Sequence, residues 1–369
     1  MVLQDIKVYF KENTLVIESN LEMEVLSSAV YRGGRQKAKF IINHKVSKNF
    51  NHKNPSLYLK NKIKELGLPI KSTVGLMTAA DVHKAAIIDE NPIKVITTAG
   101  LSNSITAGDD IILQNYGTIN TIIIIDGILK ENAFVDAIIT AIEAKTVALT
   151  QLDIRSRISK GQATGTTTDA IIIASTGQGE KYEYAGTATK IGNIIAKSVI
   201  KSVTEAIKLQ ENITQSRSML KRLEERGITL DDLINTGMEL YIHHPSMGTI
   251  ENAKRTLKEI LLESMNDINV ASLIIAGMRV EEDGKRGLIP GITAEEFIKD
   301  PVSLVADELI GMAIADYIAG SRGIFEYVRF DRIKPGILKK LGPFMDDVIG
   351  ALIGGSSSLM YTKLLKKQG

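Results

Sequence analysis

The alternation of apolar and polar residues divides the chain into a mixed first part and a helical second part. Residues 6–18 alternate on either side of Glu12 and Asn13, which predicts two strands joined by a tight turn. Short β-branched runs predict buried strands at 73–78, 93–98, 119–125 and 169–174. Helical spacing predicts helices at 55–66, 133–151 and 192–210. Strands that alternate with helices indicate an α/β or α+β domain, with buried strands and flanking helices.

After this first domain, 1–210, the apolar residues recur with the period of an α-helix. The polar stretch 210–216 is the predicted linker, and the second domain covers 217–369. Asp300-Pro301 predicts an N-cap followed by proline at the first helical position. We expect an all-α second domain with helices at 219–226, 230–241, 249–263, 267–279, 301–319 and 344–364.

Composition narrows the class of protein. The chain has 369 residues, a net charge of +2 and no cysteine, which excludes thiol nucleophiles, disulfides and cysteine-ligated zinc. So small a charge gives no support for a nucleic-acid partner. The first residues lack the basic start and apolar core of a signal peptide, and no apolar run approaches the roughly 20 residues that span a bilayer. We expect a soluble, cytoplasmic protein without membrane insertion, and homo-oligomerisation is left open.

Three acidic clusters interrupt apolar or basic segments near the C-terminus. They contain Asp307, Glu308, Asp331, Asp346 and Asp347. Adjacent acids at a helix start are often only caps, but Asp307 and Glu308 fall mid-helix in the predicted pattern. Carboxylates are costly to bury among apolar side chains, so such a helix needs a compensating partner. The clusters indicate metal-dependent phosphate chemistry, with Mg²⁺ on oxygen ligands and Lys334 as a fixed charge for the phosphate.

Small residues accompany these acids. In the last predicted helix Gly350 and Gly354 follow Asp346 on one stripe, and Gly355 follows Asp347 on the next. Glycines below an acidic tip let a second helix pack closely. We therefore expect carboxylates from two helices to meet.

The three acidic segments resemble the phosphatidylglycerophosphatase A family, over about residues 217–369. They are Asp307-Glu308-Leu309-Ile310-Gly311, Asp331-Arg332-Ile333-Lys334-Pro335 and Met345-Asp346-Asp347-Val348-Ile349-Gly350. The resemblance implies a magnesium-dependent phosphomonoesterase. Lipid-acting members have membrane helices that this pattern lacks, and the chain is more similar to a soluble branch that includes an α-ribazole-phosphate phosphatase of cobalamin assembly. Carried over position by position, the resemblance makes the five acids metal ligands or water-orienting groups and Lys334 the phosphate contact.

Polar residues of the first domain gather in stretches rich in Gly, Ala and Thr, several of them at predicted strand ends. The stretches are 43–45, 75–83, 98–103, 143–146 and 165–170. Folds of the α/β class build ligand crevices at such ends. No segment matches a phosphate loop, a dinucleotide fingerprint or a zinc-protease motif.

In this order the stretches resemble the adenosylcobinamide amidohydrolase family, from about Arg32 to Ala206. The most specific pieces are 78–82, 165–170 and 184–190. The resemblance implies hydrolysis of the amide that joins aminopropanol to the corrin ring, which releases adenosylcobyric acid. No cofactor is certain for this domain.

Amide hydrolysis needs a nucleophile, a proton donor for the leaving amine and stabilisation of the oxyanion. Without cysteine the nucleophile is water or a hydroxyl of the threonine run 166–168. Asp81, His83 and Glu143 are candidate bases and Asn103 is a candidate oxyanion donor. The full set of candidate catalytic residues is Asp81, His83, Asn103, Glu143, Thr167 and Asp169, and the candidate substrate contacts are Thr78 and Thr166.

Some roles stay open at this point. Asp169 is either catalytic or only a cap, and threonines at a strand entrance commonly serve turns. His44 and His52 lie in a basic segment that is expected to be a surface loop, and either could face the substrate.

The leading hypothesis is a bifunctional enzyme of cobamide salvage, whose substrates are a corrinoid and a phosphorylated nucleoside or adenosylcobalamin phosphate. One alternative keeps the phosphatase but gives it a lipid such as phosphatidylglycerophosphate. Another makes the first domain a non-catalytic corrinoid-binding module.

Overall fold

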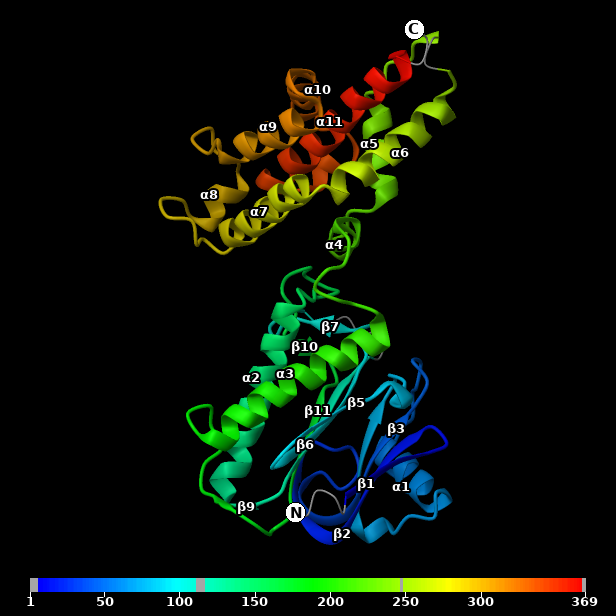
Figure 1. Ribbon diagram of the computed structural model, residues 1–369, viewed down its shortest axis with the longest axis vertical. Coiled ribbons are helices and arrows are strands. Elements are labelled where there is room, and N and C mark those ends of the chain that lie inside the picture. The colour runs from blue at the N-terminus through cyan, green and yellow to red at the C-terminus, as the bar shows by residue number, and fades with distance from the viewer. Residues whose placement is uncertain (1–5, 111–116, 246–247, 367–369) are drawn as a thin grey trace. The chain divides into compact units, whose positions relative to one another are not determined.

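The computed structural model describes residues 6–110, 117–245 and 248–366, and the chain divides into two compact units between Gln215 and Ser216. The first unit is a sheet with helices on it, and the second is helical (Figure 1). The predicted fold classes, a mixed α/β first part and a helical second part, are confirmed.

An eight-stranded mixed sheet forms the centre of the first unit. Its strands are β1 Ile6–Lys11, β2 Thr14–Ser27, β3 Gly34–Lys45, β4 Thr73–Thr78, β5 Ala86–Glu90, β6 Ile93–Ala99, β8 Ile119–Ile125 and β11 Ala170–Ser175. The order is β4-β3-β2-β11-β8-β6-β5, with β1 paired to β2. β3 is parallel to β4 and β8 is parallel to β11, and the other pairs are antiparallel. Two small sheets pair β7 Ser104–Ile105 with β10 Gly165–Thr166 and β9 Ile128–Leu129 with β12 Lys181–Tyr182.

The sheet is strongly curved, as shown by strands that are not neighbours in the sheet but are hydrogen-bonded through their side chains. Asn43 of β3 donates from Nδ2 to Thr98 Oγ1 of β6 at 2.8 Å. Asn120 of β8 donates from Nδ2 to Asn43 Oδ1 at 3.0 Å. The concave face has an apolar core of its own, which includes Leu15, Ile41, Leu76, Ile96, Ile122 and Ile172.

Helices cover the convex face. α1 Pro55–Glu65 packs Leu59 and Ile63 against Ile42 of β3. α2 Glu131–Gln151 and α3 Lys190–Glu211 lie side by side over β6, β8 and β11, and their alanines and isoleucines form a second core (Figure 1). Short 3-10 helices lie at Ile70–Ser72, Val82–Lys84 and, in the second unit, Gly336–Lys340.

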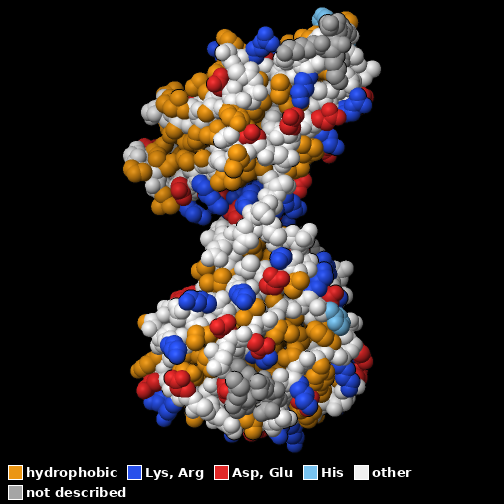
Figure 2. Space-filling view, viewed as in Figure 1, with side chains coloured by type: hydrophobic (Ala, Val, Ile, Leu, Met, Phe, Trp, Pro, Cys, Tyr) orange, Lys and Arg blue, Asp and Glu red, His pale blue; other side chains and the backbone are white. Residues whose placement is uncertain are grey.

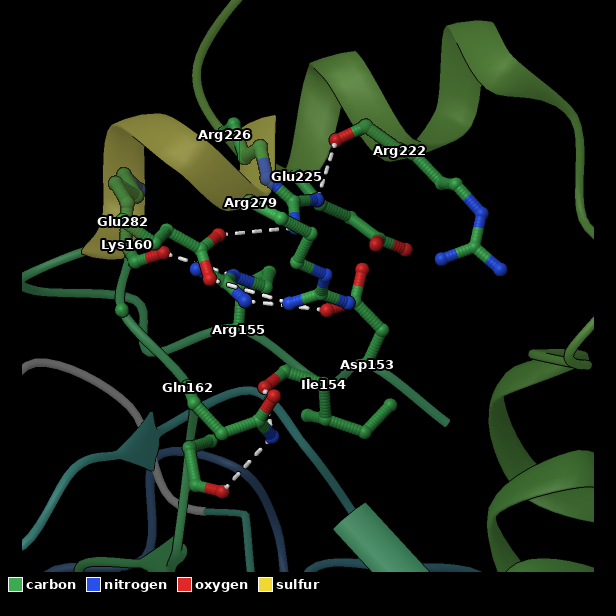
Figure 3. A network of polar contacts seen from close by, with 12 residues as sticks. Asp153, Ile154, Arg155, Lys160, Gln162, Arg222, Glu225, Arg226, Arg279 and Glu282 are labelled. Carbon is green, nitrogen blue, oxygen red and sulfur yellow. Dashed lines mark hydrogen bonds and ion pairs between the residues drawn. The ribbon is translucent and has the colours of Figure 1, made fainter. Parts of the chain in front are cut away.

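Arg155 bonds within the loop that follows α2 (Figure 3), and its carbonyl oxygen ties that loop to β7. Its Nε donates to Lys160 O at 2.8 Å and its Nη1 lies 3.1 Å from Asp153 Oδ1. Its own carbonyl oxygen accepts from Ser104 Oγ at 2.8 Å. These bonds fix the chain that leads into β10.

The second unit is built around one long helix. Its helices are α4 Met219–Glu225, α5 Leu230–Glu239, α6 Ile250–Asn266, α7 Ile268–Lys285, α8 Ala294–Ile298, α9 Ala306–Ala319, α10 Ser321–Ile333 and α11 Pro343–Lys366. α11 packs against α5, α6, α7, α9 and α10, so it is the central element. At the end of α4, Arg226 Nη2 donates to Glu282 Oε1 of α7 at 3.2 Å (Figure 3).

The predicted stripe of glycines on α11 lets neighbouring helices approach closely. A Cβ on Gly354 would lie 2.7 Å from the Tyr327 backbone of α10, and one on Gly355 would lie 3.0 Å from Ile318 of α9. Tyr327 also fills the space beside Gly311, where a Cβ would lie 2.6 Å from its hydroxyl oxygen. The small residues therefore let α9, α10 and α11 meet near the acids.

Several predicted boundaries are wrong. α9 begins at Ala306, because Asp300 ends the unpredicted helix α8 in a left-handed conformation, with φ 50°, instead of capping a helix at Pro301. α10 was missed because its apolar period is diluted by arginine and acidic residues. β3 was missed because its first half, Gly34–Ala38, is largely polar at the sheet edge.

One described helix is long and apolar enough to cross a membrane by length and composition, at Pro343–Leu365, and α6 with α7 passes the same test as a pair bent by 80°. The expectation that no segment reaches this length is therefore wrong. The glycines and serines of α11 interrupt its apolar run but add no charge. Buried residues make up 72% of its most apolar stretch, as befits the central helix of a bundle.

We expect Gly354→Ala to destabilise the second unit by about 1–3 kcal/mol, because the added methyl group overlaps a backbone that cannot move aside. The measurement is chemical denaturation of the full chain, followed by circular dichroism. Gly350→Ala is the matched control, since its Cβ would lie 3.5 Å from Leu338 and 3.8 Å from Tyr327, in ordinary contact. Equal effects of the two variants would contradict the close-packing account.

Candidate functional site

Polar side chains line the mouth of the curved sheet. Side chains two residues apart on a strand point to the same side, so Thr118 continues the concave face beyond Asn120, and Thr78 continues it beyond Leu76. A pocket of about 230 Å³ opens here. Its lining residues are Val30, Val46, Phe50, Asn51, His52, Pro55, Met77, Thr78, Ala79, Gly117, Thr118 and Thr168.

One step deeper, Asn43, Thr98 and Asn120 form a buried hydrogen-bonded group. Asn120 Nδ2 gives its two hydrogens to Asn43 Oδ1 at 3.0 Å and to Met77 O at 2.8 Å. These acceptors fix the orientation of the amide, and its Oδ1 has no partner among the described residues. The group holds β3, β4, β6 and β8 together at the base of the mouth.

A buried ion pair supports the loop that follows β10. Lys145 of α2 donates from Nζ to Asp169 Oδ2 at 2.5 Å, and their side chains are 9% and 14% exposed. The same carboxylate accepts from Thr166 N, from Thr166 Oγ1 and from Ile119 N. Gly165 makes room for this pair, since a Cβ there would lie 2.5 Å from Asp169 Oδ2. With four donors Asp169 is a structural brace.

Thr167 is held at the rim by Asn103. Asn103 Nδ2 donates to Thr167 Oγ1 at 2.6 Å, and Asn103 Oδ1 accepts from Gly117 N at 2.8 Å. Only glycine fits at 117, because a Cβ would lie 2.5 Å from Gly100 O. The Thr167 hydroxyl keeps its own hydrogen for a further acceptor.

The two histidines left open by the sequence differ sharply. His44 is 3% exposed on β3, and its Nδ1 lies 2.7 Å from Thr14 Oγ1, so the expected surface loop is wrong for this residue. Burial lowers the pKa of His44 to about 4, so it is neutral and structural. His52 lines the pocket and its Nδ1 accepts from Asn54 N at 3.0 Å. In the neutral ring Nε2 therefore carries the hydrogen and is a donor.

In the second unit, α9 and α11 bring three carboxylates together. Ligand oxygens of Asp307, Glu308 and Asp347 lie within 4.8 Å of one another. Tyr327 of α10 donates its hydroxyl hydrogen to Asp347 Oδ1 at 2.6 Å. Asp307 and Glu308 lie in the first turn of α9 and not mid-helix as expected, because the helix begins only at Ala306. The positive end of the helix dipole offsets part of their charge.

Burial raises the pKa of these acids. It raises the pKa of Asp307 to about 8, with a further contribution from the neighbouring Glu308 carboxyl. It raises the pKa of Asp347 to about 7 and that of Asp346 to about 6, and at Asp346 the ammonium of Lys334 opposes the shift. The cluster therefore costs free energy to ionise unless a cation is present.

Asp331 and Asp346 meet at Lys334. Lys334 Nζ donates to Asp346 Oδ2 at 2.5 Å and lies 3.9 Å from Asp331 Oδ1. Lys334 ends α10 in a left-handed conformation, which turns the chain toward α11. The five predicted acids thus form two neighbouring groups, one of three carboxylates and one built on a lysine.

Residues 2–215 match the family model for adenosylcobinamide amidohydrolases. The chain belongs to the adenosylcobinamide amidohydrolase family. It is 30% identical over 212 residues to the adenosylcobinamide amidohydrolase of Methanosarcina mazei, which covers 55% of this chain and 98% of that protein. An uncharacterized protein of Methanocaldococcus jannaschii is 36% identical over 132 residues, 35% of this chain and 99% of that protein.

Among solved structures, the low temperature requirement C protein of Listeria monocytogenes matches 39% of this chain and 93% of that one, at 23% identity and a TM-score of 0.35. A likeness of this size carries no conclusion. The family assignment makes the chain a hydrolase and rests on the first unit.

Most residues predicted for the amidohydrolase site lie at the mouth of the sheet. Thr78 lines the pocket, and Asn103, Thr166, Thr167 and Asp169 are linked to its Gly117–Thr118 wall. Asp81 follows Thr78 closely in the chain, and its Oδ2 lies 3.5 Å from Lys45 Nζ.

Two of the candidate bases lie elsewhere. Glu143 is exposed on α2, and two residues along a helix turn a side chain by about 200°, so it points away from the Lys145 face. His83 is exposed beside Phe10 of β1, with ring centroids 4.6 Å apart. Lys145 was missed, although it falls on the apolar face of its helix with Ala141, Ala144 and Ala148, where a lysine must have a partner.

The acids of the second unit fit a divalent cation. Asp307 Oδ2 and Glu308 Oε2 are buried without a hydrogen-bond partner among the described residues, as is Asp346 Oδ1 in the adjacent group. Unpartnered buried carboxylate oxygens are costly, and Mg²⁺ prefers oxygen ligands. Asp307, Glu308 and Asp347 would hold the ion, with Asp346 beside them.

We expect Lys145→Met to destabilise the first unit by about 3–5 kcal/mol, because it leaves the buried Asp169 carboxylate without its countercharge. Adding Asp169→Asn should restore part of the loss. Denaturation of the full chain measures both. Lys130→Met is the control, because Lys130 and its partner Glu183 are 45% and 57% exposed and such pairs contribute at most about 1 kcal/mol. A small effect of Lys145→Met would show that the pair is not needed.

The stability of the metal-free second unit should fall as pH rises. The folded-state pKa of Asp307, about 8, lies above the ordinary value of 3.8, so the folded state binds more protons and is favoured at low pH. We expect the Tm in EDTA to drop between about pH 5 and pH 8, and Mg²⁺ to raise it most at the upper end. Asp307→Asn should flatten both dependences. A Tm that is independent of Mg²⁺ at high pH would argue against a cation site.

Proposed function

We propose that the first unit hydrolyses the amide between aminopropanol and the corrin ring of adenosylcobinamide, at the mouth of the curved sheet. The observation that carries this is the pocket of about 230 Å³, where hydroxyls, peptide groups and an imidazole gather beside residues of the matched family motifs. The family assignment supports the substrate. The apolar part of the lining, which includes Phe50, Pro55 and Met77, suits the edge of a large ring.

The proposed chemistry uses neutral donors. Water attacks the amide carbon, and His52 Nε2–H donates to the carbonyl oxygen as negative charge develops on it. The Thr167 hydroxyl, positioned by Asn103, donates to the water or to the substrate. Asp81, near the rim, accepts the proton that water loses and returns it to the amide nitrogen as the C–N bond breaks, so the amine leaves with that proton.

We propose that the second unit is a magnesium-dependent phosphomonoesterase acting on α-ribazole phosphate or adenosylcobalamin phosphate. The observation that carries this is the meeting of Asp307, Glu308 and Asp347, with buried oxygens that lack partners among the described residues. When bound, Mg²⁺ supplies Lewis-acid polarisation of the phosphate and a more acidic water. Asp346 orients the attacking water, and Lys334 pairs with the phosphate oxygens once substrate competes for its ammonium group.

The first experiment follows aminopropanol release from adenosylcobinamide by mass spectrometry, in EDTA and in Mg²⁺. We expect release in both buffers, because the proposed donors need no metal. His52→Phe should lower kcat roughly 10²-fold or more by removing an oxyanion donor. Binding of the corrinoid with no release would reduce the first unit to a binding module.

The second experiment follows phosphate release from α-ribazole phosphate. We expect it to require Mg²⁺ and to be lost in Asp347→Asn, because that variant removes a charged ligand from the cluster. The variants serve as controls for each other, since His52→Phe should keep phosphatase activity and Asp347→Asn should keep amidase activity. Full phosphatase activity in folded Asp347→Asn would contradict the role of Asp347 as a metal ligand.

A further inference from the structure

Tyr327 of α10 is a buried tyrosine whose hydroxyl reaches the carboxylates of α9 and α11. In Figure 2 the acidic side chains of the visible surface lie scattered among basic and uncharged ones. Asp307 and Asp347 differ from these, because they are 0% and 4% exposed. Tyr327 is 2% exposed, and its hydroxyl donates to Asp347 Oδ1 at 2.6 Å. Among the described residues no other group donates a hydrogen bond to the Asp347 side chain.

The packing of three helices fixes the tyrosine in place. α9, α10 and α11 pack against one another (Figure 1). A Cβ on Gly311 of α9 would lie 2.6 Å from the Tyr327 hydroxyl oxygen, and one on Gly354 of α11 would lie 2.7 Å from the Tyr327 backbone. The two glycines thus leave room for the tyrosine and no more, so its hydroxyl is held against Asp347.

A donor held in this way sets the rotation of the carboxylate. A tyrosine hydroxyl keeps its hydrogen at neutral pH, so Asp347 Oδ1 stays on that hydrogen. Asp347 Oδ2 accepts no hydrogen bond from the described residues and is left for another partner. In metal sites the groups behind the ligands orient them by such bonds.

We propose that Tyr327 is a positioning residue for the cation, because its hydroxyl holds the Asp347 carboxylate in the orientation that ligates Mg²⁺. This role rests on the proposed function of the second unit, since it needs an ion among Asp307, Glu308 and Asp347. Besides the closeness of the three acids, the fully buried and unpartnered Asp307 Oδ2 points to that ion.

A purely structural role makes the opposite prediction. If the bond only satisfied a buried carboxylate, its loss would leave Asp347 in greater need of a positive partner. Mg²⁺ would then bind as tightly as before or more tightly. If the bond positions the ligand, its loss weakens Mg²⁺ binding.

The test is calorimetric titration of the full chain with Mg²⁺. We expect Tyr327→Phe to raise the Kd of Mg²⁺ roughly 10–100-fold, the usual effect of removing a partner behind a metal ligand. The Mg²⁺ concentration for half-maximal phosphate release should rise by the same factor. The kcat at saturating Mg²⁺ should be retained, because the variant keeps every proposed ligand. Since phenylalanine fills the same space as the tyrosine ring, circular dichroism in EDTA should match the wild type.

Tyr317→Phe is the matched control. The Tyr317 hydroxyl also meets a carboxylate, at 3.3 Å from Asp267 Oδ2, but it lies ten residues beyond Asp307 on α9, about 15 Å along the helix. This variant should keep the wild-type Kd of Mg²⁺. Gly311→Ala is a second test variant, which keeps the Tyr327 hydroxyl but crowds it, and it should also weaken Mg²⁺ binding.

The outcomes separate the positioning role from the cation site itself. A Kd of Mg²⁺ in Tyr327→Phe that equals the wild-type value or lies below it would overturn the positioning role and leave the cation site in place. A wild-type chain that binds no Mg²⁺ would overturn both the positioning role and the proposed phosphatase site.

Discussion

Both units depend on one constraint, that a carboxylate taken out of water must be compensated. In the first unit Asp169 receives four donors, among them the ammonium of Lys145, and the result is a closed and rigid brace. In the second unit Asp347 accepts from the Tyr327 hydroxyl, and Asp307, in the first turn of α9, accepts from Glu308 N. The first arrangement is complete within the protein. The second leaves Asp307 Oδ2 and Glu308 Oε2 without hydrogen-bond partners among the described residues, which is the arrangement expected of a candidate cation site.

The curvature of the sheet creates the candidate pocket, because it brings a buried polar group together at the base of the mouth. A flat sheet would leave Asn43, Thr98 and Asn120 on separate strands facing solvent or helices. Curvature brings their side chains together and closes the concave core at one end. The polar group marks where the apolar interior stops. The next residues outward, such as Thr78 and Thr118, are then free to line a pocket.

Local pattern predicted the buried strands 73–78 and 119–125 to the residue, because each is a short β-branched run between turn residues. It failed where tertiary contacts override spacing. The boundary at Ala306 depends on how α8 ends, and the partner of Asp169 comes from a helix 24 residues earlier. Strand ends predicted the Thr78 and Thr166–Asp169 segments, and Thr78 and Thr168 line the same pocket. The strand ends could not show that Glu143 faces away while Lys145 faces in, because that depends on how α2 sits on the sheet.

The two proposed sites differ in charge, and each lies in a unit of its own. The mouth of the sheet offers hydroxyls, peptide groups and an imidazole to a ligand. The clustered acids of the second unit have raised pKa values, so a bound cation would favour their ionised form. Two compact units, each with its own core, allow one chain to hold both.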